Sequence, residues 1–90
     1  MSVRDLVAKY VESCERALAE LKVSDVCVNV DAEEIGQVLG YARDYLKDAK
    51  YYRDEGSLEV SLTSVAYCEG MLDALRLLGM VKFEWHGKDE

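Results

Sequence analysis

The sequence has no proline, and among its 90 residues it has only one histidine, one phenylalanine and one tryptophan. The missing proline and a hydrophobic share of 50% argue against a linker or a disordered low-complexity chain. Basic residues are also scarce, because 11 Lys and Arg stand against 18 Asp and Glu, for a net charge of −7. Nucleic-acid-binding proteins gather Lys and Arg, so we expect no nucleic-acid partner.

Long apolar runs and cysteine motifs are missing as well. The longest weakly charged stretch covers residues 60–68, which is far short of the ~20 residues that cross a bilayer. The charged beginning of the chain has no apolar signal core, so we expect a cytoplasmic protein without a membrane partner. Cys14, Cys27 and Cys68 form neither an even set nor a Cys-x-x-Cys pair. This favours small buried hydrophobic residues over a disulfide framework or a zinc motif.

Three helix patterns make up most of the sequence. Apolar residues recur at spacings of three and four over residues 4–22, 31–55 and 58–78, which predicts three helices. Gly56 and Gly79 stand where the second and third helices should end, because glycine readily adopts the left-handed conformation found there. The short turn at Gly56 forces helices two and three to pack antiparallel. We therefore predict an all-α fold, a three-helix bundle in which helices two and three form an antiparallel hairpin.

Capping residues mark the starts of these helices. Ser2 followed by Asp5 predicts a capping box before the first helix. Asp31 can accept hydrogen bonds from the first turn of the second helix, and Ser57 is the expected N-cap of the third.

Two segments fall outside the helix pattern. Residues 23–30 are rich in β-branched residues, and we expect an extended, partly buried connection after helix one. The alternative is a short strand, which would need the C-terminal segment as its partner. Residues 1–81 form the predicted domain, followed by a tail, 82–90, in which Phe83 and Trp85 share one side. We expect the tail to fold back over the bundle, because an exposed Trp is costly; the alternative is an aromatic hook for a partner.

The third helix is apolar around most of its circumference, since only four of residues 58–78 are charged. Such a helix should be buried on most of its sides, by the two other helices and in part by a second copy of the protein. Gly70 and the alanines four residues before and after it form a ridge of small residues, which predicts that a neighbouring backbone comes close. Gly36 and Gly40 predict a second close approach.

Four carboxylates are candidate metal ligands. Asp44 and Asp48 lie four residues apart on helix two, and Glu69 and Asp73 lie four apart on helix three. Facing carboxylates in a helix bundle can hold Mg²⁺ or Mn²⁺. No histidine accompanies them, since His86 lies in the tail, and basic neighbours offer ion pairs instead. We expect solvated or ion-paired side chains, and no bound metal or cofactor.

Tyrosines are candidate contact residues. Tyr45 and Tyr52 lie on the core stripe of helix two, whereas Tyr41 and Tyr51 point elsewhere and Tyr67 lies on the facing helix. Tyrosine is common at interfaces because it offers contact area and a polar tip. Interface and half-buried packing are both open for these residues. With Phe83 and Trp85 of the tail, the candidate interaction residues are Tyr41, Tyr51, Tyr67, Phe83 and Trp85.

The run Glu-Gly-Met-Leu-Asp-Ala-Leu-Arg-Leu-Leu-Gly at 69–79 resembles a small archaeal family named domain of unknown function 357. The resemblance covers roughly residues 5–81 and is strongest over 45–79. It implies a compact, cytoplasmic, all-helical protein of archaeal type without an assigned activity. It offers no catalytic residues, but it draws attention to Glu69 and Asp73, which lie in its most recognisable run.

Together these patterns favour a non-enzymatic interaction module that self-associates through the third helix or the tyrosine face. The expected partner is another protein or a second copy, and no small-molecule ligand can be named. A nucleophile elbow and a phosphate-binding glycine loop are both missing from the sequence. The alternative is a metal-dependent hydrolase or nucleotide-handling enzyme that uses carboxylates on facing helices. A third possibility is an accessory subunit of a larger complex.

Overall fold

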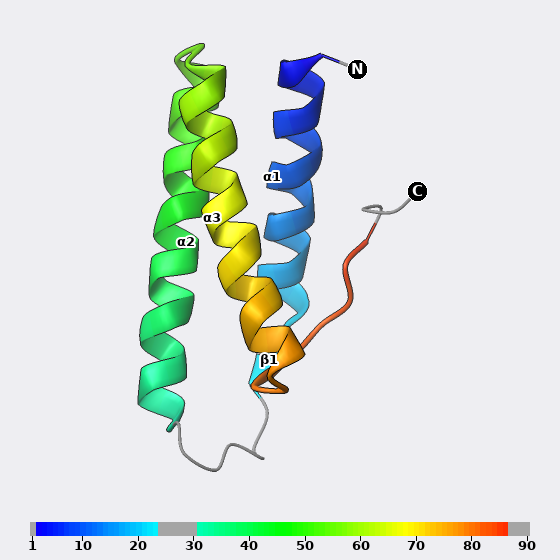
Figure 1. Cartoon of the computed structure of the whole chain (residues 1–90), viewed down its shortest axis with the longest axis vertical. Helices are drawn as coiled ribbons and strands as arrows, with labels where there is room; N and C mark the ends of the chain where they lie inside the picture. Colours follow the sequence, from blue (N-terminus) through cyan, green and yellow to red (C-terminus); the bar gives the residue numbers. More distant parts are fainter. Residues whose placement is uncertain (1, 24–30, 87–90) are drawn as a thin grey trace.

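The computed structural model describes residues 2–23 and 31–86, and it has the predicted all-α architecture of three packed helices. Figure 1 shows the helices side by side, with α3 between α2 and α1. The elements are α1 (Val3–Glu20), β1 (Lys22–Val23), α2 (Ala32–Asp54), α3 (Leu58–Leu77) and β2 (Val81–Lys82). Within the described residues, no helix has both the length and the apolar character that a membrane crossing requires.

Side-chain caps fix the starts of the first two helices. The Asp5 amide donates to Ser2 Oγ at 3.0 Å, and the Ser2 amide donates to the Asp5 carboxylate at 3.3 Å. Asp31 and Glu34 form the same reciprocal pair at the start of α2. These boxes satisfy amides that have no partner within a helix. Ser57 is the N-cap of α3, but its side chain makes no capping hydrogen bond, so that prediction holds only for its position.

Two glycines end the second and third helices as predicted. Gly56 has φ of +85° and Gly79 has φ of +77°. After α2, the Ser57 amide donates to the Tyr52 carbonyl, and after α3 the Met80 amide donates to the Leu75 carbonyl. Both are Schellman motifs, which satisfy the last carbonyls of a helix and turn the chain sharply.

The α2–α3 hairpin is held in register by two contacts between residues on facing turns. The rings of Tyr45 and Tyr67 stack with centroids 5.1 Å apart, and Ser61 Oγ donates to the Ala49 carbonyl at 2.5 Å in the core. In both pairs the two residues lie at similar distances from the Gly56 turn, which confirms the antiparallel packing. The α2–α3 contact is the most extensive in the fold, and α3 also packs on α1.

One hydrophobic core joins all three helices and the chain after α3. Buried positions recur at helical spacing in each helix, so each presents one face inward. The core residues are Val7, Val11, Cys14, Ala17, Ile35, Leu39, Ala42, Leu46, Ala49, Val65, Cys68, Leu72, Leu75, Val81 and Phe83.

The connection after α1 differs from the expectation of an extended segment without a strand partner. Lys22 and Val23 form an antiparallel ladder with Lys82 and Val81. The C-terminal segment therefore supplies the partner strand, because Val81 enters the core and brings its neighbours beside the end of α1. The rest of the predicted connection, residues 24–30, lies outside the described residues.

Candidate interaction surface

The inner side of α3 is the centre of the core. Its buried residues are Ser61, Val65, Cys68, Leu72 and Leu75. Their spacing of three and four places them along one side of the helix. This side faces α1 and α2.

The opposite side of α3 is exposed and almost free of charge. We call this the outer face; it comprises Thr63, Ala66, Tyr67, Gly70, Met71, Ala74 and Leu77. Its middle forms an open groove of about 670 Å³, bordered on one edge by Leu62. Leu77 is 75% exposed and its neighbour Leu78 is 68% exposed. Within the described chain, the other elements therefore cover only one side of α3, and the rest of its apolar circumference faces solvent.

The ridge of small residues lies on this outer face, and among the described residues nothing packs against its central Gly70. A Cβ atom built on Gly70 would meet no atom within 4 Å, and the same holds at Gly36 and Gly40. The predicted close approach of a neighbouring backbone at these three glycines is therefore wrong within the described residues. The inner surfaces of the helices pack through Ala42 and Ala49 instead, which are fully buried.

The tyrosines divide between the groove and other surfaces. Tyr67 lies in the groove, 56% exposed, with one ring face stacked on Tyr45 at an interplanar angle of 15°. Tyr41 is exposed one helical turn before Tyr45, on the same side of α2. Tyr51 is exposed as well, but it contacts the ring of Tyr52 edge-on. Of the predicted tyrosines, Tyr67 thus lines the groove, whereas Tyr41 and Tyr51 do not.

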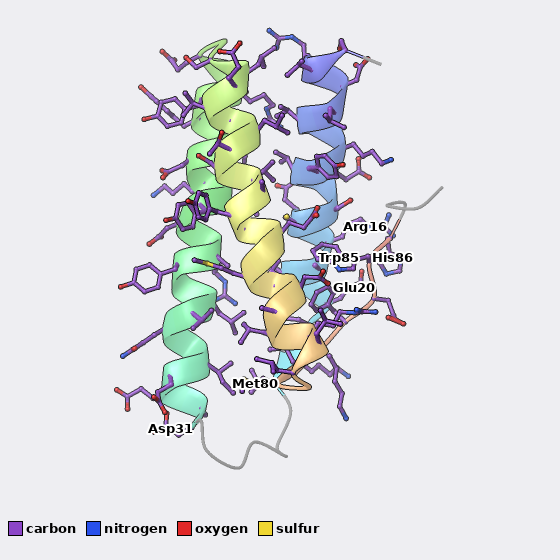
Figure 2. The ribbon with its side chains drawn as sticks, in the orientation of Figure 1. Arg16, Glu20, Asp31, Met80, Trp85 and His86 are labelled. Carbon is purple, nitrogen blue, oxygen red and sulfur yellow. The ribbon has the colours of Figure 1, made fainter. Side chains whose placement is uncertain are left out.

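Phe83 and Trp85 belong to the folded-back part of the tail. Phe83 is buried, and its ring meets that of Trp85 edge-on at 4.9 Å. Trp85 Nε1 donates to Asp73 Oδ1 at 3.0 Å. Figure 2 shows Trp85 and His86 beside Glu20, whose carboxylate lies 2.8 Å from the His86 ring. Through residue 86 the tail lies against the helices, and neither aromatic ring forms a protruding hook.

The four candidate carboxylates do not gather at one place. Asp44 and Asp48 are exposed on α2. Asp73 accepts the Trp85 hydrogen bond and lies 3.9 Å from the Arg76 guanidinium. Among the described residues, no group of three or more histidine, cysteine or acidic side chains is placed to hold a metal ion.

Two cysteines meet inside the core, between α1 and α3. Cys14 and Cys68 are fully buried free thiols. Their hydrogen bond lowers the pKa of the Cys68 thiol from its ordinary value, whereas burial and the nearby Glu69 carboxylate act in the opposite direction. Full burial keeps this pair away from reagents in water, so it serves packing, as the sequence predicted for Cys14 and Cys68.

Basic residues that the sequence did not single out lie beyond the C-terminal end of α3. Lys22 and Lys82 are direct partners across the β1–β2 ladder, and both are exposed. They line a second hollow, of about 710 Å³, together with Leu77 of the outer face. Like charges directly opposite one another destabilise a strand pair. The lysines come together only because residues 22 and 82 pair across the ladder. Sequence analysis could not find this cluster, because a strand of two residues is too short to show an alternating pattern.

One known protein family matches most of the chain. The family described as protein of unknown function (DUF357) matches residues 9–81. No curated protein and no solved structure gives a significant match. The matched region includes all of α2, α3 and the groove.

Proposed function

The chain belongs to the DUF357 family of proteins of unknown function, and we propose that it is a non-enzymatic protein-interaction module whose contact surface is the outer face of α3. The observation that carries this proposal is an apolar groove that faces solvent on an otherwise strongly acidic protein. A soluble monomer rarely exposes a continuous apolar patch, because contact between apolar surface and water is unfavourable. A partner that covers the patch removes this contact and so lowers the free energy.

The composition of the groove supports a protein partner. Its floor is made of small residues, with Gly70 at the centre, and Tyr67 and Met71 stand along one edge. Aromatic residues and methionine are enriched at protein interfaces. Charged side chains are excluded from its lining, which disfavours nucleic acid and phosphate-bearing ligands.

The enzyme alternative gains no support from the described geometry. A metal-dependent hydrolase would need its carboxylates close together, and Asp44 and Asp48 lie exposed while Asp73 is engaged by the tail. The buried free thiols of Cys14 and Cys68 are in keeping with a reducing, cytoplasmic setting. A cytoplasmic location and an archaeal source remain part of the proposal.

Site-specific photo-cross-linking tests the proposed surface. A photoreactive amino acid replaces Leu77 on the outer face, and in a matched control it replaces Lys47, an exposed residue of α2. We expect protein adducts in native extract from position 77 and few from position 47. Equal yields from the two positions, or no adduct from position 77, would contradict the proposal. Either a second copy or a different protein in the adduct would support it.

A further inference from the structure

We propose that the partner of the outer face is a second copy of this chain, packed antiparallel on α3 about a two-fold axis close to Gly70. This inference rests on the proposed function, because it names the occupant of the same surface. Three observations carry it: the distribution of charge along the face, the opposed lysines at one end, and the fit of the face to its own reversed copy.

Charge limits how two copies can meet. Each chain carries a net charge of −7, so contact between most pairs of surfaces places carboxylates against carboxylates. The outer face is the exception, since no charged side chain lines its groove. Two copies that meet there bury apolar surface and leave their acidic sides apart.

The two ends of the outer face carry opposite charges. Glu59 is exposed in the first turn of α3, in line with Thr63 and Ala66. At the other end, Lys22 and Lys82 share a hollow with Leu77. The face is therefore acidic at one end, apolar in the middle and basic at the other end.

Such a face is complementary to itself only when one copy is reversed. Glu59 lies eleven residues before Gly70, and Leu77, which shares the hollow with Lys22 and Lys82, lies seven residues after it. An antiparallel pair centred on Gly70 brings the Glu59 end of one copy toward the Lys22 and Lys82 end of the other, and the two-fold axis repeats this contact. A parallel pair would instead place Glu59 against Glu59 and lysines against lysines.

Among the described residues, neither of the opposed lysines has an acidic partner. Glu20 and Glu84 line the same hollow, but Glu20 contacts His86 and Glu84 contacts Arg76. Within the described residues, no ion pair includes either Lys22 or Lys82. A carboxylate from a second copy would offset the repulsion between them.

The shape of the face also suits a second helix. Gly70 and the alanines on either side carry no large side chain, so two α3 helices can approach closely there. Figure 1 looks down the shortest axis of a molecule measuring 42 × 26 × 16 Å, and α3 runs along the middle of this broad side.

Sedimentation equilibrium of the full chain tests the dimer. We expect a species of twice the 10.2 kDa chain mass at micromolar concentration. Gly70→Arg puts two like charges beside the axis and should raise the dissociation constant at least tenfold. Gly36→Arg is the matched control, because Gly36 is another helical glycine with open space around it, and it should leave the constant unchanged.

Charge reversal tests the antiparallel orientation. Glu59→Lys and Lys82→Glu should each weaken the dimer several-fold, and the double variant should restore it. A strictly monomeric chain at high micromolar concentration, or a dimer that tolerates Gly70→Arg, overturns the inference. Failure of the double variant to restore the dimer overturns the antiparallel arrangement. If the chain is monomeric while position 77 still cross-links a different protein, the second copy is wrong and the proposed function stands. If the chain is monomeric and position 77 gives no adduct, both the second copy and the proposed function are wrong.

Discussion

The two sides of α3 are built from similar apolar residues but have opposite surroundings. The inner side holds Leu72, which is fully buried, and the outer side holds Leu77, which is 75% exposed. Polar groups differ in the same way, because Ser61 hydrogen-bonds across to α2 whereas Thr63 bonds only to its own helix. The comparison teaches that apolar content alone does not say which side of a helix stabilises the monomer. The side that stabilises the monomer is the one covered by α1, α2 and the returning tail.

Truncating one leucine on each side should give the largest difference. Leu72→Ala removes a fully buried side chain and leaves a cavity, so we expect the free energy of unfolding to fall by about 2–5 kcal/mol. Leu77→Ala should change it by less than about 0.5 kcal/mol, because that side chain is exposed in the monomer. Urea denaturation followed by circular dichroism, in dilute solution, measures both.

Equal losses in the two variants would contradict the assignment of inner and outer sides. A large loss from Leu77→Ala alone would mean that the outer face is covered even in the dilute chain.

Local signals in the sequence predicted the helix ends correctly. The Ser2 and Asp31 caps and the glycine turn at Gly56 act through neighbours within a few residues, so their effect is visible in a short window. The antiparallel packing of α2 and α3 also followed, because only three residues separate the two helices, and Tyr45 meets Tyr67 accordingly.

The sequence did not reveal in the same way which side of α3 faces the core or which segment pairs with the tail. Periodicity identifies the buried side of a helix only when the other side is polar, and α3 is apolar on both. Ser61 was therefore not identified as a core residue, and Gly70 was wrongly expected to touch a neighbour. The β1–β2 pairing depends on residues about sixty positions apart and on a ladder too short to show alternation.

The hydroxyl groups of Ser61 on the inner side and Thr63 on the outer side provide a finer test of the difference between the two sides of α3. Ser61→Ala removes a buried hydrogen bond to the Ala49 carbonyl, so we expect a loss of about 1 kcal/mol in the free energy of unfolding. Thr63→Ala removes only an exposed bond to the Glu59 carbonyl and introduces a better helix former, so no loss is expected. Thermal and urea unfolding of both variants measure the difference, and a greater loss in Thr63→Ala would reverse the assignment.

The smallest expected effect has the opposite sign and concerns the glycines. Gly70→Ala should raise the free energy of unfolding of the dilute chain by roughly 0.5–1 kcal/mol, because the new methyl group meets open space and alanine restricts the unfolded chain. Gly36→Ala should give the same gain for the same reason. Gly56→Ala should instead destabilise the chain, since its φ of +85° strains any residue with a Cβ atom. If Gly70→Ala lowered stability while Gly36→Ala raised it, a backbone would lie against Gly70 even in the monomer. In that case the outer face could not be free to receive a partner.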